Sequence, residues 1–302
     1  MYPDLCKLYC ILQKTKFTLF SVILIFGIIE NGLVIWIAGF RMKKTINAVW
    51  FLNLAITDFL CCTTIPLHIV WDTELIHWRS RYIFEVVMTV SLVIAMSASV
   101  LLLTAMSIDR WVSVMLPFWA KVHRTHKLAK IIAGVIWMFC LVVTGVVCSF
   151  VVKYVGQITS IEIMDIVDLV RLVVLFVIPF LIISTCYVTI FFKIRKSKRL
   201  QRSQRPYRII TAVILCFFIC WAPYYTWPFI FRDIYYDDRY IIKIVMYSLV
   251  FLNSCINPII YVFMDQDFRD GFLTSIPFRL KTDLREQPVN TKGSQLSTTT
   301  YV

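Results

Sequence analysis

The sequence carries little charge, since only 16% of its 302 residues are Asp, Glu, Lys or Arg while 59% are hydrophobic. A soluble domain is about 25% charged, so this composition excludes one. The alternation of apolar and polar residues that marks the strands of a membrane β-barrel is also missing. What remains is a membrane protein built from helices, in agreement with a mean hydropathy of +0.76.

Seven apolar segments are long enough to cross a membrane, which takes about 20 residues of helix. In lipid every backbone N–H and C=O group needs a partner within the protein, and a helix supplies these partners within one segment. The predicted fold class is therefore an all-α membrane protein with a seven-transmembrane helix bundle. No internal or inverted repeat of the kind found in transporters is present. The spans cover residues 17–40, 47–71, 82–114, 128–152, 166–192, 207–231 and 241–264.

Acidic residues are missing from three of the loops that connect these spans. The first of these loops carries Arg41, Lys43 and Lys44, and the others hold the basic residues of 121–127 and 193–208. The remaining loops mix both signs of charge. The positive-inside rule therefore predicts a multi-pass plasma-membrane protein with an extracellular N-terminus and a cytoplasmic C-terminus. This topology and anionic inner-leaflet lipid account for the net charge of +13, so nucleic acid is not expected as a partner.

The chain divides into a short extracellular N-terminus, the bundle, a juxtamembrane segment and a tail. These parts cover 1–16, 17–264, 265–280 and 281–302. The juxtamembrane segment places Phe268, Phe272, Leu273 and Ile276 on one helical face, which predicts a short amphipathic helix on the membrane lipid after the seventh span. The tail is polar and rich in Ser and Thr, so we expect it to be disordered and, when phosphorylated, to bind arrestin.

An acidic side chain lies in the middle of the second span, where a charge is costly in lipid. Asp58 should therefore face the bundle interior, where oxygen atoms of Ser99, Asn253 and Asn257 can reach it. Such a set suits a small hard cation such as Na⁺, or a proton. The alternative is a protonated aspartate that is hydrogen-bonded in the core. Glu30 in the first span is a second buried acid, interpreted as a structural hydrogen-bonding group.

Asp109-Arg110-Trp111 lies at the inner end of the third span. At a membrane edge the guanidinium group of Arg110 can pair with Asp109 or reach backbone carbonyl groups. Alternatively, the arginine only anchors its helix at the boundary.

Arg171 lies in the fifth span, two turns before Pro179 and toward the outside. An arginine at that depth should face an aqueous cavity, where it would attract a carboxylate. An ion pair with Asp168, one turn away, is the alternative. In the sixth span Pro223 allows a kink, and the ring of Trp221 beside it can couple a ligand above to movement below.

Further motifs stand at regular places along the seven spans. They are Asn31, Leu54 to Asp58, Asp109-Arg110-Trp111, Trp137, Pro179, Tyr187, Cys220-Trp221-Ala222-Pro223 and Asn257-Pro258-Ile259-Ile260-Tyr261. In this order they resemble the rhodopsin-like family of G-protein-coupled receptors over nearly the whole chain. The resemblance implies a receptor, not an enzyme, that binds a ligand outside and activates a heterotrimeric G protein inside.

Some stretches resemble one branch of that family, the chemoattractant receptors for formyl peptides, anaphylatoxins and chemerin. The stretches that start at Asn31 and Asn253 are most similar to formyl-peptide receptors. The stretch around Arg171 resembles anaphylatoxin receptors, where this arginine helps to hold the carboxylate of a peptide. Formyl-peptide receptors add a second Arg and an Asp where this chain has Val167 and Val93, which disfavours a formyl-methionine ligand. The expected ligand is therefore another peptide or small chemoattractant.

Both cysteines of the family's usual outer disulfide are missing. The position in the third span reads Phe84-Glu85-Val86, and no cysteine lies between Cys148 and Cys186. This absence predicts a freer outer loop, because a disulfide restricts chain conformations. Whether Cys6 and Cys10 pair with each other or with Cys148 is left open by the sequence.

We expect three groups of functional residues, with no organic cofactor and no metal beyond a sodium ion at Asp58. The ligand-binding group is Arg171, Asp168, Trp221, Tyr225 and Tyr247. The sodium or polar-switch group is Asp58, Ser99, Asn253 and Asn257, and the G-protein-coupling group is Asp109, Arg110, Tyr187 and Tyr261. Two alternatives remain: a ligand-binding or arrestin-biased receptor with weak G-protein coupling, and a transporter or channel built on Glu30 and Asp58.

Overall fold

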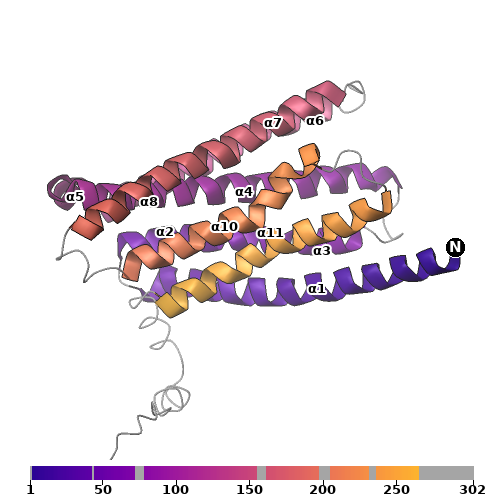
Figure 1. The fold of residues 1–302 in the computed structure, drawn as a ribbon, viewed down its shortest axis with the longest axis horizontal. Helices are drawn as coiled ribbons and strands as arrows, with labels where there is room; N and C mark the ends of the chain where they lie inside the picture. Colours follow the sequence, from indigo (N-terminus) through magenta and orange to yellow (C-terminus); the bar gives the residue numbers. More distant parts are fainter. Residues whose placement is uncertain are drawn as a thin grey trace, which may run out of the picture.

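The structure is a computed structural model that describes residues 2–42, 44–71, 78–154, 161–196, 205–230 and 236–264. The regular elements in these ranges are all helices, and they lie side by side as long rods (Figure 1). This arrangement confirms the predicted all-α fold class. The elements are α1 (Tyr2–Trp36), η1 (Ile37–Arg41), α2 (Ile46–Thr63), α3 (Ile65–Val70), α4 (Trp78–Met115), α5 (Pro117–His123), α6 (His126–Tyr154), α7 (Ile161–Leu172), η2 (Val173–Val177), α8 (Ile178–Lys196), α10 (Arg205–Ile230) and α11 (Tyr236–Met264).

The rods correspond to the predicted spans, although three spans consist of more than one element, the first of them α1 followed by η1. A turn at Thr64 separates α2 from α3, and the fifth span consists of α7, η2 and α8 in succession. Six rods are long and apolar enough to cross a membrane, and α10 contains the shorter apolar stretch Ile214–Ile230.

The bounds of the structure differ from the predicted ones at the N-terminal end of the chain and in one loop. α1 begins at Tyr2, so its helix includes the segment that we placed before the first span. The loop between the third and fourth spans contains α5, which we did not predict. The amphipathic helix predicted for 265–280 and the tail of 281–302 lie outside the described residues.

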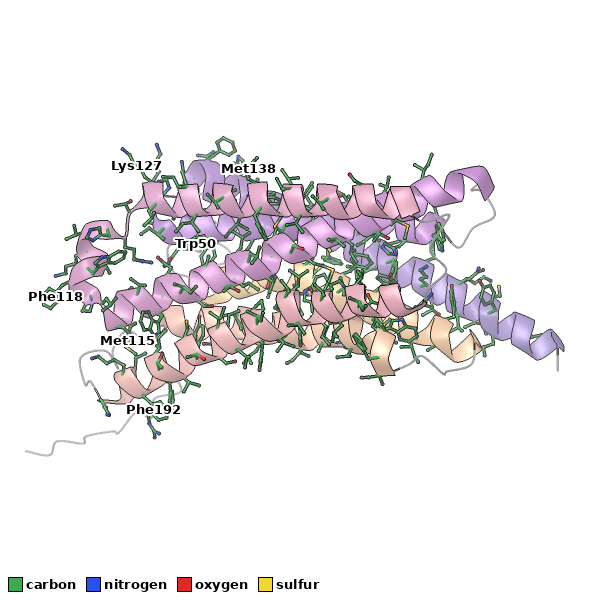
Figure 2. The ribbon with its side chains drawn as sticks, turned by 90° about the horizontal axis from the view of Figure 1, so that it is seen from above. Trp50, Met115, Phe118, Lys127, Met138 and Phe192 are labelled. Atoms are coloured by element: carbon green, nitrogen blue, oxygen red, sulfur yellow. The ribbon has the colours of Figure 1, made fainter. Side chains whose placement is uncertain are left out.

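The bundle is apolar both inside and outside. Trp50, Phe51 and Phe251 are buried in its interior, whereas Met138 of α6 and Phe192 of α8 are more than half exposed on its surface. Figure 2 shows Met138 and Phe192 at the periphery, with Trp50 between the helices. An apolar surface of this extent is stable only against lipid, which is consistent with spans that cross a membrane.

Pro179 explains the irregular turn in the fifth span. Proline has no N–H group, and its ring clashes with the carbonyl group four residues earlier, which belongs to Leu175. The five residues around that carbonyl form the π-helical segment η2, Val173–Val177, and the α-helix resumes at Ile178. Arg171 lies two residues before the start of this wider turn, so η2 affects the direction in which the end of α7 presents Arg171.

α10 bends toward its C-terminal end, where Pro223 and Pro228 lie inside the helix (Figure 1). Thr226 between them donates from Oγ1 to the carbonyl oxygen of Ala222 over 2.8 Å. Proline is the usual cause of a sharp helix bend, because it removes one backbone hydrogen bond and pushes the preceding turn aside. The bend follows Trp221, and the ring of Tyr224 beyond it lies 6.0 Å from that of Tyr247 on α11.

Pro258 removes a backbone hydrogen bond from α11, and a side chain of α1 replaces it. An uninterrupted helix would bond the N–H group of residue 258 to the carbonyl oxygen of Ser254. That oxygen instead accepts a hydrogen bond of 2.9 Å from Nδ2 of Asn31, which also donates to the carbonyl oxygen of Gly27 over 2.9 Å. Asn31 is fully buried, so this contact fixes α1 against the break in α11.

α1, α2 and α11 approach closely at Gly27. A Cβ atom added to Gly27 would lie 2.4 Å from Sγ of Cys62 on α2 and 3.3 Å from Sγ of Cys255 on α11. Cys255 also donates from its thiol to the carbonyl oxygen of Ile23 over 3.6 Å. Only glycine allows this packing without displacement of the neighbouring thiols.

Candidate functional site

An ion pair organises the end of the bundle that holds Arg110, which we call the Arg110 end. Arg124 donates from Nε and Nη2 to the two carboxylate oxygens of Asp109, over 2.8 and 2.7 Å. α5 begins at Pro117, whose fixed φ angle suits the first helical position, and ends directly before Arg124. This short helix therefore places Arg124 where it reaches the end of α4.

Arg110 has a different partner from the one that its sequence neighbour suggests. It is buried, with 8% of its surface exposed, and donates from Nη2 to Oδ1 of Asn47 at the start of α2. The sequence offered Asp109 and backbone carbonyl groups as partners, but the carboxylate of Asp109 is held by Arg124. The Asp-Arg motif thus joins α4 to two other segments, the start of α2 and the loop after α5.

The remaining residues assigned to G-protein coupling lie on α8 and α11. Trp111 donates from Nε1 to Oγ1 of Thr189 over 3.0 Å, which ties α4 to α8. Tyr187 lies two residues before Thr189 on α8 and is half-buried against the hydrophobic core. The backbone of Tyr261 belongs to α11, but its side chain lies outside the described residues.

The four predicted switch residues Asp58, Ser99, Asn253 and Asn257 are all buried in the bundle and are called the polar cluster. Asp58 is buried, with 3% of its surface exposed, and its Oδ2 accepts a hydrogen bond of 2.8 Å from Nδ2 of Asn257. Ser99 and Asn253 are buried as well. Among the described residues, Oγ of Ser99 and the Oδ1 atoms of Asn253 and Asn257 have no hydrogen-bond partner. Uncommitted oxygen atoms of this kind, together with one carboxylate, fit a small hard cation such as Na⁺.

No group of three or more His, Cys, Asp or Glu side chains is positioned to hold a metal ion in the described ranges. A cation in the polar cluster would therefore depend on the Asp58 carboxylate and neutral oxygens, which is a ligand set for an alkali-metal ion rather than for zinc.

The fourth span is tied to α2 by a hydrogen bond that the sequence did not reveal. Trp137 donates from Nε1 to Oδ1 of Asn53 over 3.0 Å, and Asn53 donates from Nδ2 to the carbonyl oxygen of Val49 over 2.7 Å. The polar side chain of Asn53 is therefore satisfied on both sides. The hydrogen bond from Trp137 to Asn53 thereby holds α6 against α2.

The opposite end of the bundle holds Arg171 and is called the Arg171 end. Nη2 of Arg171 lies 2.9 Å from Oδ1 of Asp168, and Nη1 donates to the hydroxyl oxygen of Tyr224 over 3.5 Å. The Cζ atom of Arg171 lies 5.1 Å from the ring centroid of Tyr224 and 6.0 Å from that of Tyr225. The Asp168 ion pair that we considered as the alternative role is therefore present. The side chain of Arg171 keeps 22% of its surface exposed.

An aromatic row extends from Arg171 toward α3 and α11. The ring of Tyr224 lies 6.0 Å from those of Trp221 and Tyr247, and the Tyr247 ring lies 4.5 Å from that of His68. Trp221 and Tyr225 are buried, and their Nε1 and hydroxyl groups have no partner among the described residues. The five predicted ligand residues, Arg171, Asp168, Trp221, Tyr225 and Tyr247, thus belong to one connected cluster, in which Asp168 joins through its ion pair with Arg171.

Sequence reasoning missed several residues of these clusters. Tyr224 could have been found, because it lies three positions after Trp221 and helix residues at this spacing are neighbours. His68 also gave a signal, since an ionisable residue inside a span is rare and usually faces the interior. Asn47 and Arg124 gave no such signal in the sequence, because their contacts with Arg110 and Asp109 depend on the path of two loops.

The fold defines the class of protein: a membrane protein built from a bundle of apolar helices. A sequence model described as "7 transmembrane receptor (rhodopsin family)" matches residues 30–261. The chain therefore belongs to the rhodopsin family of seven-transmembrane receptors.

Three relatives show to which receptors of the family this chain is similar. N-formyl peptide receptor 3 of Macaca mulatta is 35% identical over 92% of this chain and 88% of its own length. Formyl peptide receptor 2 of Mus musculus is 32% identical over the same shares of both chains. Chemerin-like receptor 1 of Sus scrofa is 36% identical over 88% of this chain and 81% of its own length.

These relationships confirm several predictions. The seven-span architecture, the receptor class and the similarity to chemoattractant receptors all hold, and the protein is a multi-pass receptor of the plasma membrane. Membership of this family also confirms that the chain is a receptor and not an enzyme.

Proposed function

We propose that this receptor binds a peptide or peptide-like chemoattractant at the Arg171 end and activates a heterotrimeric G protein at the Arg110 end. The observation that carries the proposal is the Arg171 cluster. A planar cation is held on the faces of Tyr224 and Tyr225 while part of its side chain stays exposed. Arginine in this setting can bind a carboxylate with two parallel hydrogen bonds.

The names of the relatives support a peptide ligand. Two are receptors for formyl peptides and one is a chemerin-like receptor. Their identities of 32–36% indicate shared ancestry. The sequence has Val93 and Val167 at the positions where its resemblance to formyl-peptide receptors implies an Asp and a second Arg. We therefore place the ligand of this receptor among peptides with a free carboxylate, and a formyl group is not required.

The Arg110 end is the cytoplasmic end in this proposal. Basic residues are concentrated there, including Lys44, Lys121, Lys127 and Lys193. Their attraction to anionic lipid of the inner leaflet favours this orientation. The N-terminus and the Arg171 cluster then face the outside.

Signal transfer requires only that the ligand binds one of two conformations more tightly. A ligand that contacts Arg171 and the aromatic row acts on Trp221, which lies before the bend at Pro223. Movement of the other half of α10 would change the surroundings of Arg110. A shift from 1% to 99% active receptor needs about 10⁴-fold tighter binding to the active state.

A sodium ion at Asp58 and arrestin at the phosphorylated tail complete the proposal. The ion would be held by Asp58 with oxygen atoms of Ser99, Asn253 and Asn257, and would stabilise the conformation with lower agonist affinity. Arrestin would bind the Ser- and Thr-rich segment of 281–302 after phosphorylation.

Agonist-dependent nucleotide exchange tests the proposed function. Purified receptor in lipid nanodiscs is mixed with a heterotrimeric G protein and a set of chemoattractant peptides, each with a free and an amidated C-terminus. We expect exchange to rise with at least one peptide in its free-carboxylate form. Peptides that bind and recruit arrestin without any exchange would instead support the arrestin-biased alternative.

A further inference from the structure

Two thiols from different helices meet beside Gly27. A Cβ atom added to Gly27 of α1 would lie 2.4 Å from Sγ of Cys62 on α2 and 3.3 Å from Sγ of Cys255 on α11. The separation of the two sulfur atoms therefore cannot exceed the sum of these distances. Both cysteines are free thiols, and their side chains interact across the interface between α2 and α11.

The side chains of Cys62 and Cys255 are close enough to form a disulfide bond. Such a bond needs sulfur atoms about 2.05 Å apart and Cβ atoms about 3.8 Å apart. Cβ of Cys62 lies only 3.4 Å from the position of the added Gly27 Cβ atom, and Sγ of Cys255 lies 3.3 Å from the same position. Because Gly27 has no side chain, the space between the three helices is left to the two sulfur atoms. Formation of the bond therefore takes rotation of the side chains and a small adjustment of α2 and α11.

The neighbouring cysteine on α2 points elsewhere. Cys61 is buried like Cys62, but successive residues of a helix point about 100° apart, at 3.6 residues per turn. The thiol of Cys61 accordingly lies beside Ser254 of α11. Cys61 therefore provides a control in the same helix turn, with the same chemistry and the same burial.

The thiol pair adjoins the polar cluster. Asp58 precedes Cys62 by four residues on α2, and residues at this spacing are neighbours on one helix face. Cys255 likewise precedes Asn257 by two residues on α11. Both thiols are buried, so only a small oxidant can reach them in the folded protein. The oxygen atoms of the polar cluster can hydrogen-bond a small polar molecule, which makes this side the approach for a hydroperoxide.

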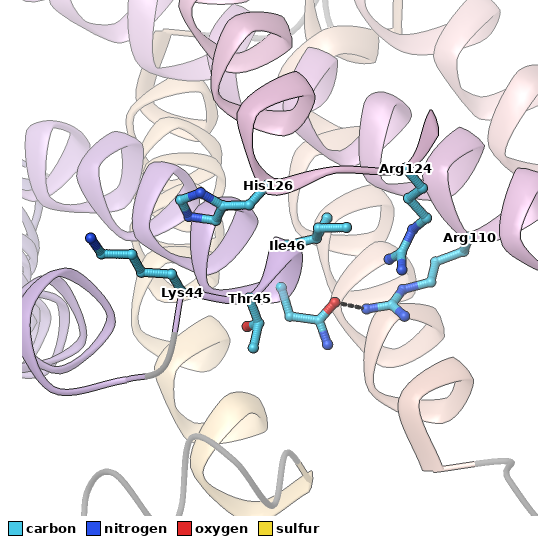
Figure 3. Close-up of a pocket in the computed structure, with 7 residues that line it drawn as sticks. Lys44, Thr45, Ile46, Arg110, Arg124 and His126 are labelled. Carbon is cyan, nitrogen blue, oxygen red and sulfur yellow. Dashed lines mark hydrogen bonds between the residues drawn. The ribbon is translucent and has the colours of Figure 1, made fainter. Parts of the chain in front are cut away.

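A bond between α2 and α11 would restrain two parts of the signalling machinery. Cys255 lies three residues before Pro258, where α11 lacks a backbone hydrogen bond. The helix of Cys62 carries Asn47 at its start, which accepts the hydrogen bond from Arg110 (Figure 3). A covalent link would fix the distance between the two helices, so α11 could no longer move against the helix that holds Arg110.

We propose that Cys62 and Cys255 are a site of reversible oxidation, and that their disulfide links α2 to α11 and lowers activation of the G protein. The oxidant is a small hydroperoxide such as hydrogen peroxide. The effect on the G protein rests on the proposed function, whereas formation of the bond does not.

The reaction takes two steps. Sγ of Cys62 attacks one oxygen of the peroxide and the O–O bond breaks. The leaving hydroxide takes the thiol proton, which gives water and a sulfenic acid on Cys62. Sγ of Cys255 then attacks the Cys62 sulfur, the S–O bond breaks, and the second hydroxide leaves as water with the proton of Cys255. Two thiols are thereby oxidised to one disulfide, and one peroxide is reduced to two water molecules.

Peptide mapping tests the bond without any agonist or G protein. Full-length receptor in lipid nanodiscs is treated with hydrogen peroxide, digested without reduction and analysed by mass spectrometry. We expect a peptide pair joined through Cys62 and Cys255, which dithiothreitol separates. Oxidation of the exposed Cys10 in the same sample confirms that the oxidant was active.

Two further measurements follow the effect of the bond on the oxidised receptor. Hydrogen–deuterium exchange should become slower in the part of α11 from 251 to 264, because the crosslink opposes its opening. Basal nucleotide exchange on a heterotrimeric G protein should fall several-fold. Dithiothreitol should reverse both changes, and this comparison uses a single protein, so misfolding of a variant cannot mimic the result.

Three variants make the result specific to the pair. Cys62→Ala and Cys255→Ala should each lose the joined peptides and the response of nucleotide exchange to peroxide. Cys61→Ala should keep both, because its thiol lies beside Ser254. The unfolding temperature of each reduced variant checks that it has folded.

Three outcomes would overturn the proposal. The first is an absence of joined peptides in a sample in which Cys10 is oxidised. The second is a disulfide that leaves hydrogen–deuterium exchange in α11 unchanged. The third is a bond that is lost in Cys61→Ala but kept in Cys62→Ala, which would assign it to another thiol. A receptor that forms the bond and slows exchange in α11, yet never activates a G protein, would refute the proposed function alone, so the two proposals fail separately.

Discussion

Asp109 and Arg124 are joined by two parallel hydrogen bonds of 2.8 and 2.7 Å, across a separation of fifteen residues in the sequence. The adjacent Arg110 bonds to Asn47 of α2 instead. Asp109 therefore holds the loop after α5 in place, and Arg110 holds the start of α2. A two-residue motif at the end of α4 thus organises both neighbouring loops.

The first prediction concerns the stability of this ion pair. Asp109→Asn and Arg124→Gln should each lower the free energy of unfolding by about 1–2 kcal/mol, between the values for exposed and buried pairs. In a double-mutant cycle the two losses should not add, because both remove the same interaction. Unfolding in mixed detergent, followed by circular dichroism, measures the coupling. Strictly additive losses would show that the pair contributes no interaction energy.

The second prediction concerns the contact between α1 and α2. Gly27→Ala should lower the unfolding temperature, because its methyl group would lie 2.4 Å from Sγ of Cys62 and overpacking costs about 1–3 kcal/mol. Gly134→Ala is the matched control, since nothing lies within 4 Å of its added Cβ atom. The control should be neutral or slightly stabilising, because alanine favours a helix over glycine. Cys62→Ala should partly restore the Gly27→Ala protein.

The third prediction separates the two roles of Arg171. Arg171→Ala should reduce the affinity for a carboxylate-bearing agonist by about 10- to 100-fold, the size of a charge-assisted hydrogen bond. Arg171→Lys should fall between wild type and alanine, because a point charge replaces the planar group. Asp168→Asn removes a competing carboxylate, so agonist affinity should be unchanged or higher. If Asp168→Asn and Arg171→Ala reduce binding equally, the ion pair is structural and the ligand assignment is wrong.

The fourth prediction concerns sodium. In wild-type receptor, sodium ions should lower agonist affinity, since a cation bound in one conformation shifts the equilibrium away from the other. Asp58→Asn should abolish this effect, and Ser99→Ala should weaken it. Glu30→Gln is the control, because Glu30 is another partly buried acid in a span but lies outside the polar cluster. Radioligand binding in sodium and in an organic cation of equal ionic strength gives the comparison. An Asp58→Asn receptor with the sodium response of wild type would rule out this site.

The fifth prediction concerns the tail, which lies outside the described residues. Truncation after Gln287 should reduce agonist-driven arrestin recruitment and leave nucleotide exchange largely unchanged. A full-length receptor with alanine at every Ser and Thr after Gln287 should behave like the truncated one. Replacement of the same residues by glutamate should restore part of the recruitment. Undiminished recruitment by the truncated receptor would mean that the tail does not bind arrestin.

The seven spans could be predicted because each depends on a local run of apolar residues. The meeting of Asp58 and Asn257 could also be anticipated, since buried polar groups in lipid must find each other. The ion pair of Asp109 could not, because the position of Arg124 depends on a turn that starts at Pro117. Pro179 indicated a break in its helix but not the form of the break. A kink and a π-helical turn both relieve the clash between the proline ring and the carbonyl group four residues earlier, so the sequence could not distinguish them.

The hydrogen bond from Asn31 to the carbonyl oxygen of Ser254 has a consequence for movement. The bond missing at Pro258 is made from another helix, so α11 has a joint there rather than a rigid turn. If α11 moves outward at this joint, the carbonyl oxygen of Ser254 either pulls α1 with it or exchanges its hydrogen bond from Asn31 for one from water. In the first case α1 moves together with α11. In the second case the hydrogen bond from Asn31 must break before α11 can move, and the change of conformation then costs the free energy of that bond. In both cases, movement of the seventh span changes the contact between Ser254 and the N-terminal helix.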